Sequence, residues 1–184
     1  IFAGGTQSEA IEFRDYSAVV EASGNEARSL AIIAETKRLI PNKPIRYLVN
    51  SHHHLDHAGG LRTFVAEGAT IITHEINKPY WEAIFKNPHM RKPDKLAQNP
   101  KPAAFITVKD KYVLTDGNRS LELLLETDQM HDQGLLMVFL PKEKVLFPSD
   151  AFMLNHWRPG TPGSRSTVGM GDNLLANIKR LKLD

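Results

Sequence analysis

The chain has 184 residues, of which 41 % are hydrophobic and 24 % are charged, as is usual for one soluble globular domain with its own core. No apolar run approaches the ~20 residues of a membrane span, and a net charge of +2 with scattered Lys and Arg gives no footprint for nucleic acid. Because the chain has no cysteine, a metal would have to be held by histidines and carboxylates. We expect no membrane or nucleic-acid partner, while compartment and oligomeric state are not readable from these features.

The first hundred residues alternate between strand and helix patterns. Short runs rich in strand formers, separated by turns such as Gly4-Gly5 and Arg14-Asp15, predict strands at 10–13, 16–20, 45–50 and 70–73. Apolar residues at helical spacing, bounded by capping residues, glycine or proline, predict helices at 26–40, 61–67 and 77–85. The first helix is expected to pack on a sheet through Leu30, Ile33, Ala34 and Leu39. The proline-rich residues 88–102 predict a surface loop that shapes access to a site.

A dense group of polar residues follows the strand at 45–50. Four potential metal ligands fall within six positions: His52, His54, Asp56 and His57. Residues two apart in an extended segment point the same way, so His52 and His54 can face one ion while His53 faces away into a packing or supporting role. Asp56 and His57 come where the chain curls into a helix, which turns them toward a second position. Because imidazole with carboxylate suits zinc, we favour one or two metal ions here over a chance cluster or a solvated loop.

The pattern His52-x-His54-x-Asp56-His57, followed by Gly59-Gly60, resembles the signature of the metallo-β-lactamase superfamily. The resemblance implies an α+β fold, the αββα sandwich, in which two mixed, largely antiparallel sheets pack face to face with helices on the outer faces. It also implies one or two metals at one edge of the sheets. The further ligands implied by the family are a loop His, an Asp after an apolar strand and a final His near the C-terminus.

The second half of the chain can be compared with that pattern. Strands are predicted at 105–108, 111–114, 120–126, 135–140 and 145–147, which build a second β-rich half. The loop after the third of these strands contains His131, and Asp150 follows the last of them. The resemblance therefore implies that His131 completes a first position with His52 and His54, and that Asp150 joins the second.

Several other polar and aromatic residues have weaker signals. His74 and His89 match no ligand position and are expected to be structural or exposed, and the aromatic pair Tyr80-Trp81 is expected in the core rather than in a pocket. Glu21 stands where the family more often has an Asp that supports the metal site, and an exposed strand-end carboxylate is an equally open alternative. A long loop, 151–171, is expected to meet a substrate through residues 155–158, before a last helix that is capped by Asp172 or Asn173.

The family pattern would continue with a strand and a His that completes the second metal position, and no residue after Asp184 supplies it. We therefore expect residues 1–184 to be a single metallo-β-lactamase-like domain, truncated at one or both ends. The second position would then be held only by Asp56, His57 and Asp150.

Zinc chemistry suits hydrolysis, because a catalytic zinc lowers the pKa of its water to about 7 and supplies hydroxide without a separate base. Asp56 could orient this nucleophile. We find no Gly-x-Ser-x-Gly, no cysteine nucleophile and no glycine-rich phosphate loop. The favoured function is hydrolysis of a small ester, thioester, lactone or amide, including a β-lactam. A catalytically weak or inactive metal-binding interaction domain and an iron oxygenase of the same superfamily stay open, with iron and manganese less favoured than zinc.

Overall fold

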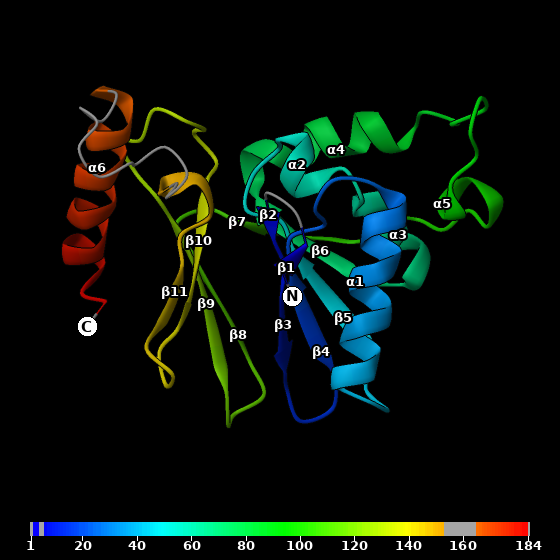
Figure 1. Ribbon diagram of the computed structural model, residues 1–184, viewed down its shortest axis with the longest axis horizontal. Helices are drawn as coiled ribbons and strands as arrows, with labels where there is room; N and C mark the ends of the chain where they lie inside the picture. The colour runs from blue at the N-terminus through cyan, green and yellow to red at the C-terminus, as the bar shows by residue number, and fades with distance from the viewer. Residues whose placement is uncertain (1, 4–5, 153–164, 184) are drawn as a thin grey trace. The chain divides into compact units, whose positions relative to one another are not determined.

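The structure is a computed structural model that describes the chain except residues 1, 4–5, 153–164 and 184 (Figure 1). The chain divides into two compact units, residues 1–107 and residues 108–184. Each unit has its own sheet and its own helices, so the predicted α+β class is confirmed. The expected turn at Gly4-Gly5 lies outside the described residues.

The sheet of the first unit has five strands in the order β3-β4-β5-β6-β7. β3 and β4 form an antiparallel hairpin around Arg14-Asp15, and β4, β5 and β6 run parallel to one another. The strands are β3 (Glu9–Glu12), β4 (Ser17–Val20), β5 (Ile45–Val49), β6 (Thr70–His74) and β7 (Phe105–Val108), beside a small two-stranded sheet of β1 (Phe2–Ala3) and β2 (Thr6–Gln7). The sequence wrongly placed β7 in the second half, because a run of strand patterns does not reveal which sheet edge each strand joins.

The helices of the first unit begin and end close to the predicted residues. Asn25 caps α1, since its side-chain oxygen accepts a hydrogen bond from the Arg28 amide at 3.1 Å, and Gly68 ends α3 with a φ of 100°. The helices are α1 (Glu26–Leu39), α2 (Leu55–Ala58), α3 (Leu61–Glu67), η1 (Glu75–Asn77), α4 (Lys78–Phe85) and α5 (Lys95–Gln98). The short α5 corrects the expected loop at 88–102: Asp94 caps it by accepting from the Ala97 amide at 2.8 Å.

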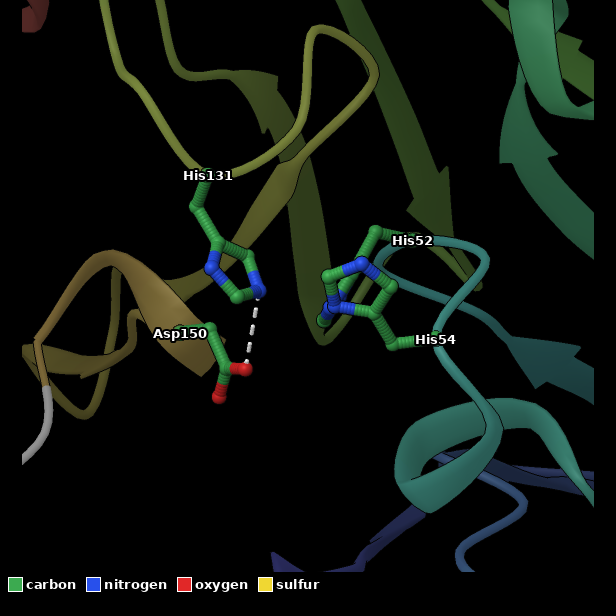
Figure 2. Close-up of side chains that lie close together, drawn as sticks. All are labelled: His52, His54, His131 and Asp150. Atoms are coloured by element: carbon green, nitrogen blue, oxygen red, sulfur yellow. Dashed lines mark hydrogen bonds and ion pairs between the residues drawn. The ribbon is translucent and has the colours of Figure 1, made fainter.

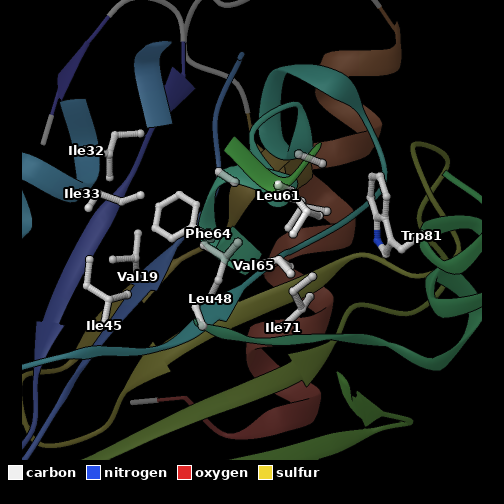
Figure 3. Close-up of a cluster of buried hydrophobic side chains, with 14 residues drawn as sticks. Val19, Ile32, Ile33, Ile45, Leu48, Leu61, Phe64, Val65, Ile71 and Trp81 are labelled. Carbon is white, nitrogen blue, oxygen red and sulfur yellow. The ribbon is translucent and has the colours of Figure 1, made fainter. Parts of the chain in front are cut away.

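The core of the first unit lies between its sheet and α1, α3 and α4 (Figure 3). Phe64, Leu48 and Ile71 are fully buried, and burial of each such side chain contributes about 1.5–3 kcal/mol. Trp81 joins this core as expected, whereas Tyr80 beside it is 42 % exposed.

The packed face of α1 includes Ile33, as predicted, but differs from the predicted face at the other positions. Leu30 and Leu39 are 37 % and 53 % exposed, while Ser29, Ile32, Ile33 and Thr36 are buried. The missing side chain of Gly60 allows close approach to Ser29, because an added Cβ on Gly60 would lie only 1.8 Å from the Ser29 hydroxyl oxygen. Close backbone packing at the helix start therefore decides which stripe is buried, and apolar periodicity does not reveal it.

The sheet of the second unit has four antiparallel strands in the order β11-β10-β9-β8. Its elements are β8 (Lys111–Thr115), β9 (Ser120–Leu125), β10 (Leu136–Leu140), β11 (Val145–Phe147), η2 (Ser149–Ala151) and α6 (Arg165–Leu181). β10 is buried almost throughout, in agreement with its continuous apolar run.

The last helix, α6, begins at Arg165, well before the predicted caps Asp172 and Asn173, which lie inside it. Gly169 and Gly171 misled the prediction, because glycine costs about 1 kcal/mol in a helix and normally marks its boundary. Asn173 and Asn177 compensate by donating to the Thr127 carbonyl at 2.9 Å and 3.0 Å, which fixes α6 at the end of β9. None of the described helices has the length and hydropathy that crossing a bilayer requires.

Candidate metal centre

The His-rich motif begins where β5 ends and leads directly into α2. His52 is fully buried, and its Nδ1 lies 2.8 Å from the Ser51 hydroxyl. On the other side of the ring, His52 Nε2 lies 3.1 Å from His54 Nδ1, and the two rings point toward one another (Figure 2). Nitrogen ligands at 2.0–2.1 Å around a tetrahedral zinc are about 3.3 Å apart, so this pair has the spacing that two ligands of one ion need.

The other two motif residues lie at the start of α2. His57 is buried, with its ring centroid 4.5 Å from that of His52, whereas the Asp56 side chain is 62 % exposed. His57 Nε2 and Asp56 Oδ2 are 3.5 Å apart. The first unit thus brings all four predicted motif residues to one end of β5, with one exposed carboxylate.

His53 does not point away from the motif as strand parity predicted, because its ring lies beside that of His54 at a centroid distance of 4.9 Å. Its ring packs edge-on against Tyr80 at a centroid distance of 5.6 Å, in agreement with a packing role. His74 is buried and accepts a hydrogen bond from the Ile76 amide at 3.3 Å, and His89 lies 3.7 Å from an Asp94 oxygen. Both residues have structural contacts, as expected.

The second unit brings His131 and Asp150 together. His131 Nε2 lies 3.1 Å from Asp150 Oδ2, an ion pair drawn in Figure 2, and this spacing also suits two ligands of one ion. The Gln129 side-chain oxygen accepts from the backbone amides of His131 and Asp132 at 2.6 Å and 3.1 Å. This side chain holds the loop in the conformation that presents His131. Residues 155–158, which were expected to meet a substrate, lie outside the described residues.

The comparisons with known proteins show the family and the fold of the chain. The family model of the metallo-β-lactamase superfamily matches residues 4–183. The chain belongs to the metallo-β-lactamase superfamily. Comparison with curated protein sequences gives no match.

Solved metallo-β-lactamases show the same fold at low identity. A metallo-β-lactamase from Pontibacter korlensis is 15 % identical with a TM-score of 0.67, and the match covers 93 % of this chain and 72 % of that one. One from Hirschia baltica is 18 % identical with a TM-score of 0.59, covering 91 % and 73 %. A different relative, rubredoxin oxygen:oxidoreductase from Desulfovibrio gigas, is 24 % identical with a TM-score of 0.57, covering 76 % of this chain and 31 % of that one.

Two buried polar residues of this metallo-β-lactamase fold support the motif. The sequence left the role of one of them, Glu21, open and did not indicate the other, Asn50. Glu21 is fully buried rather than exposed, and its carboxylate lies 3.3 Å from His57 Nδ1 and 3.4 Å from the Ser51 amide. Asn50 donates to the His52 carbonyl at 2.6 Å and accepts from Trp81 Nε1 at 3.1 Å. Asn50 could have been found from the sequence, because it is a polar residue at the end of an apolar strand, just before the histidines.

Steric contacts explain why the motif ends in two glycines, Gly59 and Gly60. An added Cβ on Gly59 would lie 1.9 Å from the Gly24 carbonyl oxygen. The Gly24 amide in turn donates to the Asp56 carbonyl at 3.0 Å, and the Ala22 amide to the His57 carbonyl at 3.0 Å. The loop after β4 therefore binds the backbone of the metal motif directly.

Two carboxyls have strongly raised pKa values. Burial, together with the nearby charge of Glu21, raises the pKa of Glu9 to about 8. Burial raises the pKa of Glu126 to about 7, although the charge of His131 opposes this. Glu126 stands at the end of β9, five residues before His131.

Proposed function

We propose that this protein is a zinc-dependent hydrolase of a small ester, thioester, lactone or amide, a class that includes β-lactams. The observation that carries this proposal is the pair formed by the buried His52 and the partly buried His54, whose facing nitrogens are 3.1 Å apart. Its position on the signature motif of a chain that belongs to a largely hydrolytic superfamily supports the same conclusion.

For the ligands, we propose that His131 of the second unit completes the first metal position with His52 and His54. Asp56 and His57 would hold a second ion with Asp150. The support for this assignment is family membership together with the 3.1 Å spacing of the His52 and His54 ligand atoms. A set of three neutral imidazoles suits zinc, and the second set, with two carboxylates, leaves that position weaker.

A bound zinc would supply a water of lowered pKa and polarise the scissile carbonyl. The residues of the chain would do the rest: Asp56, whose side chain is 62 % exposed, would orient the attacking water. His57, held by Glu21, restricts the position of Asp56 from the buried side.

Two relatives favour a second candidate. The Desulfovibrio gigas protein is named as an oxygen oxidoreductase, and a flavodiiron protein from Giardia intestinalis is 21 % identical with a TM-score of 0.53, covering 77 % of this chain and 31 % of that one. Imidazole and carboxylate also suit iron, so a redox function with iron is the alternative enzyme. A metal-binding interaction domain without turnover is the alternative that is not an enzyme.

The test uses protein that is purified without added metal. Metal content is measured first, and hydrolysis is then assayed on a panel of one chromogenic ester, thioester, lactone and β-lactam, before and after chelation and zinc addition. The proposal expects bound zinc and a chelator-sensitive activity on at least one class. Bound iron with no hydrolysis would support the redox candidate instead, and metal without any turnover would support the interaction domain.

Four single variants test the ligands. His52→Ala and His131→Ala are expected to lose most of the metal and all activity, while His53→Ala and His74→Ala serve as matched histidine controls and keep both. If His131→Ala retained full zinc content, the assignment of the third ligand would be wrong.

A further inference from the structure

The second unit contains a cavity of about 170 Å³, which lies between the residues that follow β9 and the first described turns of α6. Its walls include Glu126, Gln129 and Met130 on one side and Gly169 and Met170 on the other. One water needs roughly 10–15 Å³ measured in this way, so the space exceeds that of a single solvent molecule several-fold. Because Asn173 and Asn177 bind the Thr127 carbonyl, the helix wall is fixed in place.

The cavity wall contains unsatisfied polar groups. Glu126 is 2 % exposed, and neither of its carboxylate oxygens has a hydrogen-bond partner in the part of the chain that the structure describes. The same is true of the buried Gln129 Nε2, although the other end of this amide holds the His131 loop. Buried polar groups normally have partners, so two such residues on one cavity require an explanation.

The lining determines which ligand would satisfy the Glu126 carboxylate. A second carboxylate, Asp128, also lines the cavity, and none of its described lining residues is Lys or Arg. Met130 and Met170 add soft, adaptable apolar surface. Two carboxylates with no Lys or Arg among the described lining residues favour a cation, and the methionines favour a short hydrocarbon attached to it.

We propose that this cavity binds a small alkylammonium group, with its charged nitrogen on Glu126 and its hydrocarbon between Met130 and Met170. The group could be a substituent of the hydrolysed substrate or a separate small amine. The binding test uses protein without metal, so its outcome does not depend on the proposed metal chemistry.

The binding experiment titrates metal-free protein with n-butylammonium and follows the backbone amide resonances of residues 126–131. It is run at about pH 8, above the pKa of Glu126, so that the carboxylate is ionised. A probe of about five non-hydrogen atoms should saturate with a Kd on the order of 1 mM. n-Butanol and butyrate, which match its length, should bind at least about tenfold more weakly because they lack the positive charge. Equal binding of butyrate, or no saturation by n-butylammonium, would overturn the proposal.

Glu126→Gln keeps the shape of the side chain and removes its charge, and is expected to weaken n-butylammonium binding about tenfold or more. Glu143→Gln, a charge control in the same unit whose carboxylate pairs with Arg119, should leave the Kd unchanged. Unaltered binding by Glu126→Gln would exclude this carboxylate as the anchor.

A second pair of variants does not depend on how Glu126→Gln folds. An added Cβ on Gly169 would meet only the Met130 methyl at 3.7 Å, so Gly169→Leu can fill the cavity from the helix side. Gly171→Leu makes the same change two residues along α6, at a position that does not line the cavity. Both should strengthen the helix, but only Gly169→Leu should abolish n-butylammonium binding. Loss of binding in neither variant or in both would contradict the assigned location.

The source of the group follows from kinetics once a hydrolysed substrate is known. Competitive inhibition by n-butylammonium would identify the cavity as a subsite for a cationic substrate, and inhibition or activation without competition would identify a separate ligand. If no hydrolysis is found, the proposed function fails while the binding result stands.

Discussion

The Glu21 carboxylate lies 3.3 Å from His57 Nδ1, and both side chains are buried. Glu21 adopts a left-handed backbone conformation, with a φ of 68°, directly after β4. A non-glycine residue in this conformation is uncommon and is retained where the surroundings determine it. The position and tautomer of His57 are thus fixed from behind by a residue that is not itself a proposed ligand.

We predict that Glu21→Gln will fold but bind the weaker zinc about 10–100-fold less tightly, because partners that orient a ligating histidine typically contribute this much. Zinc titration of metal-free protein measures the effect, with the exposed Glu12→Gln on β3 as the control. An unchanged affinity in Glu21→Gln would show that His57 needs no such support or is not a ligand.

Gly59→Ala is expected to lower the free energy of unfolding by about 3 kcal/mol or more, because the new Cβ overlaps the Gly24 carbonyl oxygen and the backbone must move. The φ of Gly59 is −61°, so the loss would come from the close contact alone. Gly117→Ala is the opposite case, with a φ of 86° and nothing near the added Cβ, and should cost about 1 kcal/mol. Urea denaturation compares the two, and equal losses would contradict the packing described for the motif.

Asn50 links the core to the metal motif, so its removal should be costly. Asn50→Ala leaves Trp81 Nε1 and the Thr73 hydroxyl without their buried acceptor and frees the His52 carbonyl, which predicts a loss of about 2–4 kcal/mol. Trp81→Phe removes the indole N–H together with part of the buried ring, and should cost less in hydrogen bonding because Asn50 keeps its other partners. Chemical denaturation measures the loss of stability. Zinc titration of the same variant should show weaker zinc binding in Asn50→Ala. Unaltered affinity would separate Asn50 from the metal site.

The pH dependence of stability should report the buried Glu126. Its pKa rises from 4.5 in the unfolded chain to about 7 in the folded protein, so the folded state binds the proton more tightly. Stability is therefore lost as the pH rises from about 4.5 through about 7. Glu126→Gln cannot ionise and should be roughly 1–2 kcal/mol more stable than the wild type at about pH 8, with no gain at about pH 4. Thermal unfolding of amine-free protein at both pH values measures this, and a gain of equal size at both would contradict it.

Local signals in the sequence predicted most elements and the motif. Asn25 as a helix cap, Gly68 as a helix end and the facing of His52 and His54 each depend on neighbouring residues only, and the structure agrees with them. The ligand assignment itself stays a prediction.

The failures share one cause, which is that they depend on contacts between residues far apart in the chain. The sheet joined by β7 and the buried face of α1 are decided by tertiary packing, and so is the burial of Glu21, which the sequence left open. The early start of α6 belongs to the same group, since the Thr127 carbonyl that binds Asn173 and Asn177 lies about fifty residues away.

The central claim is that His52 and His54, with His131, form a zinc site, and zinc titration of metal-free protein by calorimetry tests it most directly. We predict one tight event and one weaker event: the tight one is lost in His52→Ala and His131→Ala, and the weaker one is lost in Asp150→Ala while the tight one survives. His53→Ala should match the wild type. Absence of a saturable zinc event, or a tight event that survives His52→Ala, would contradict the account.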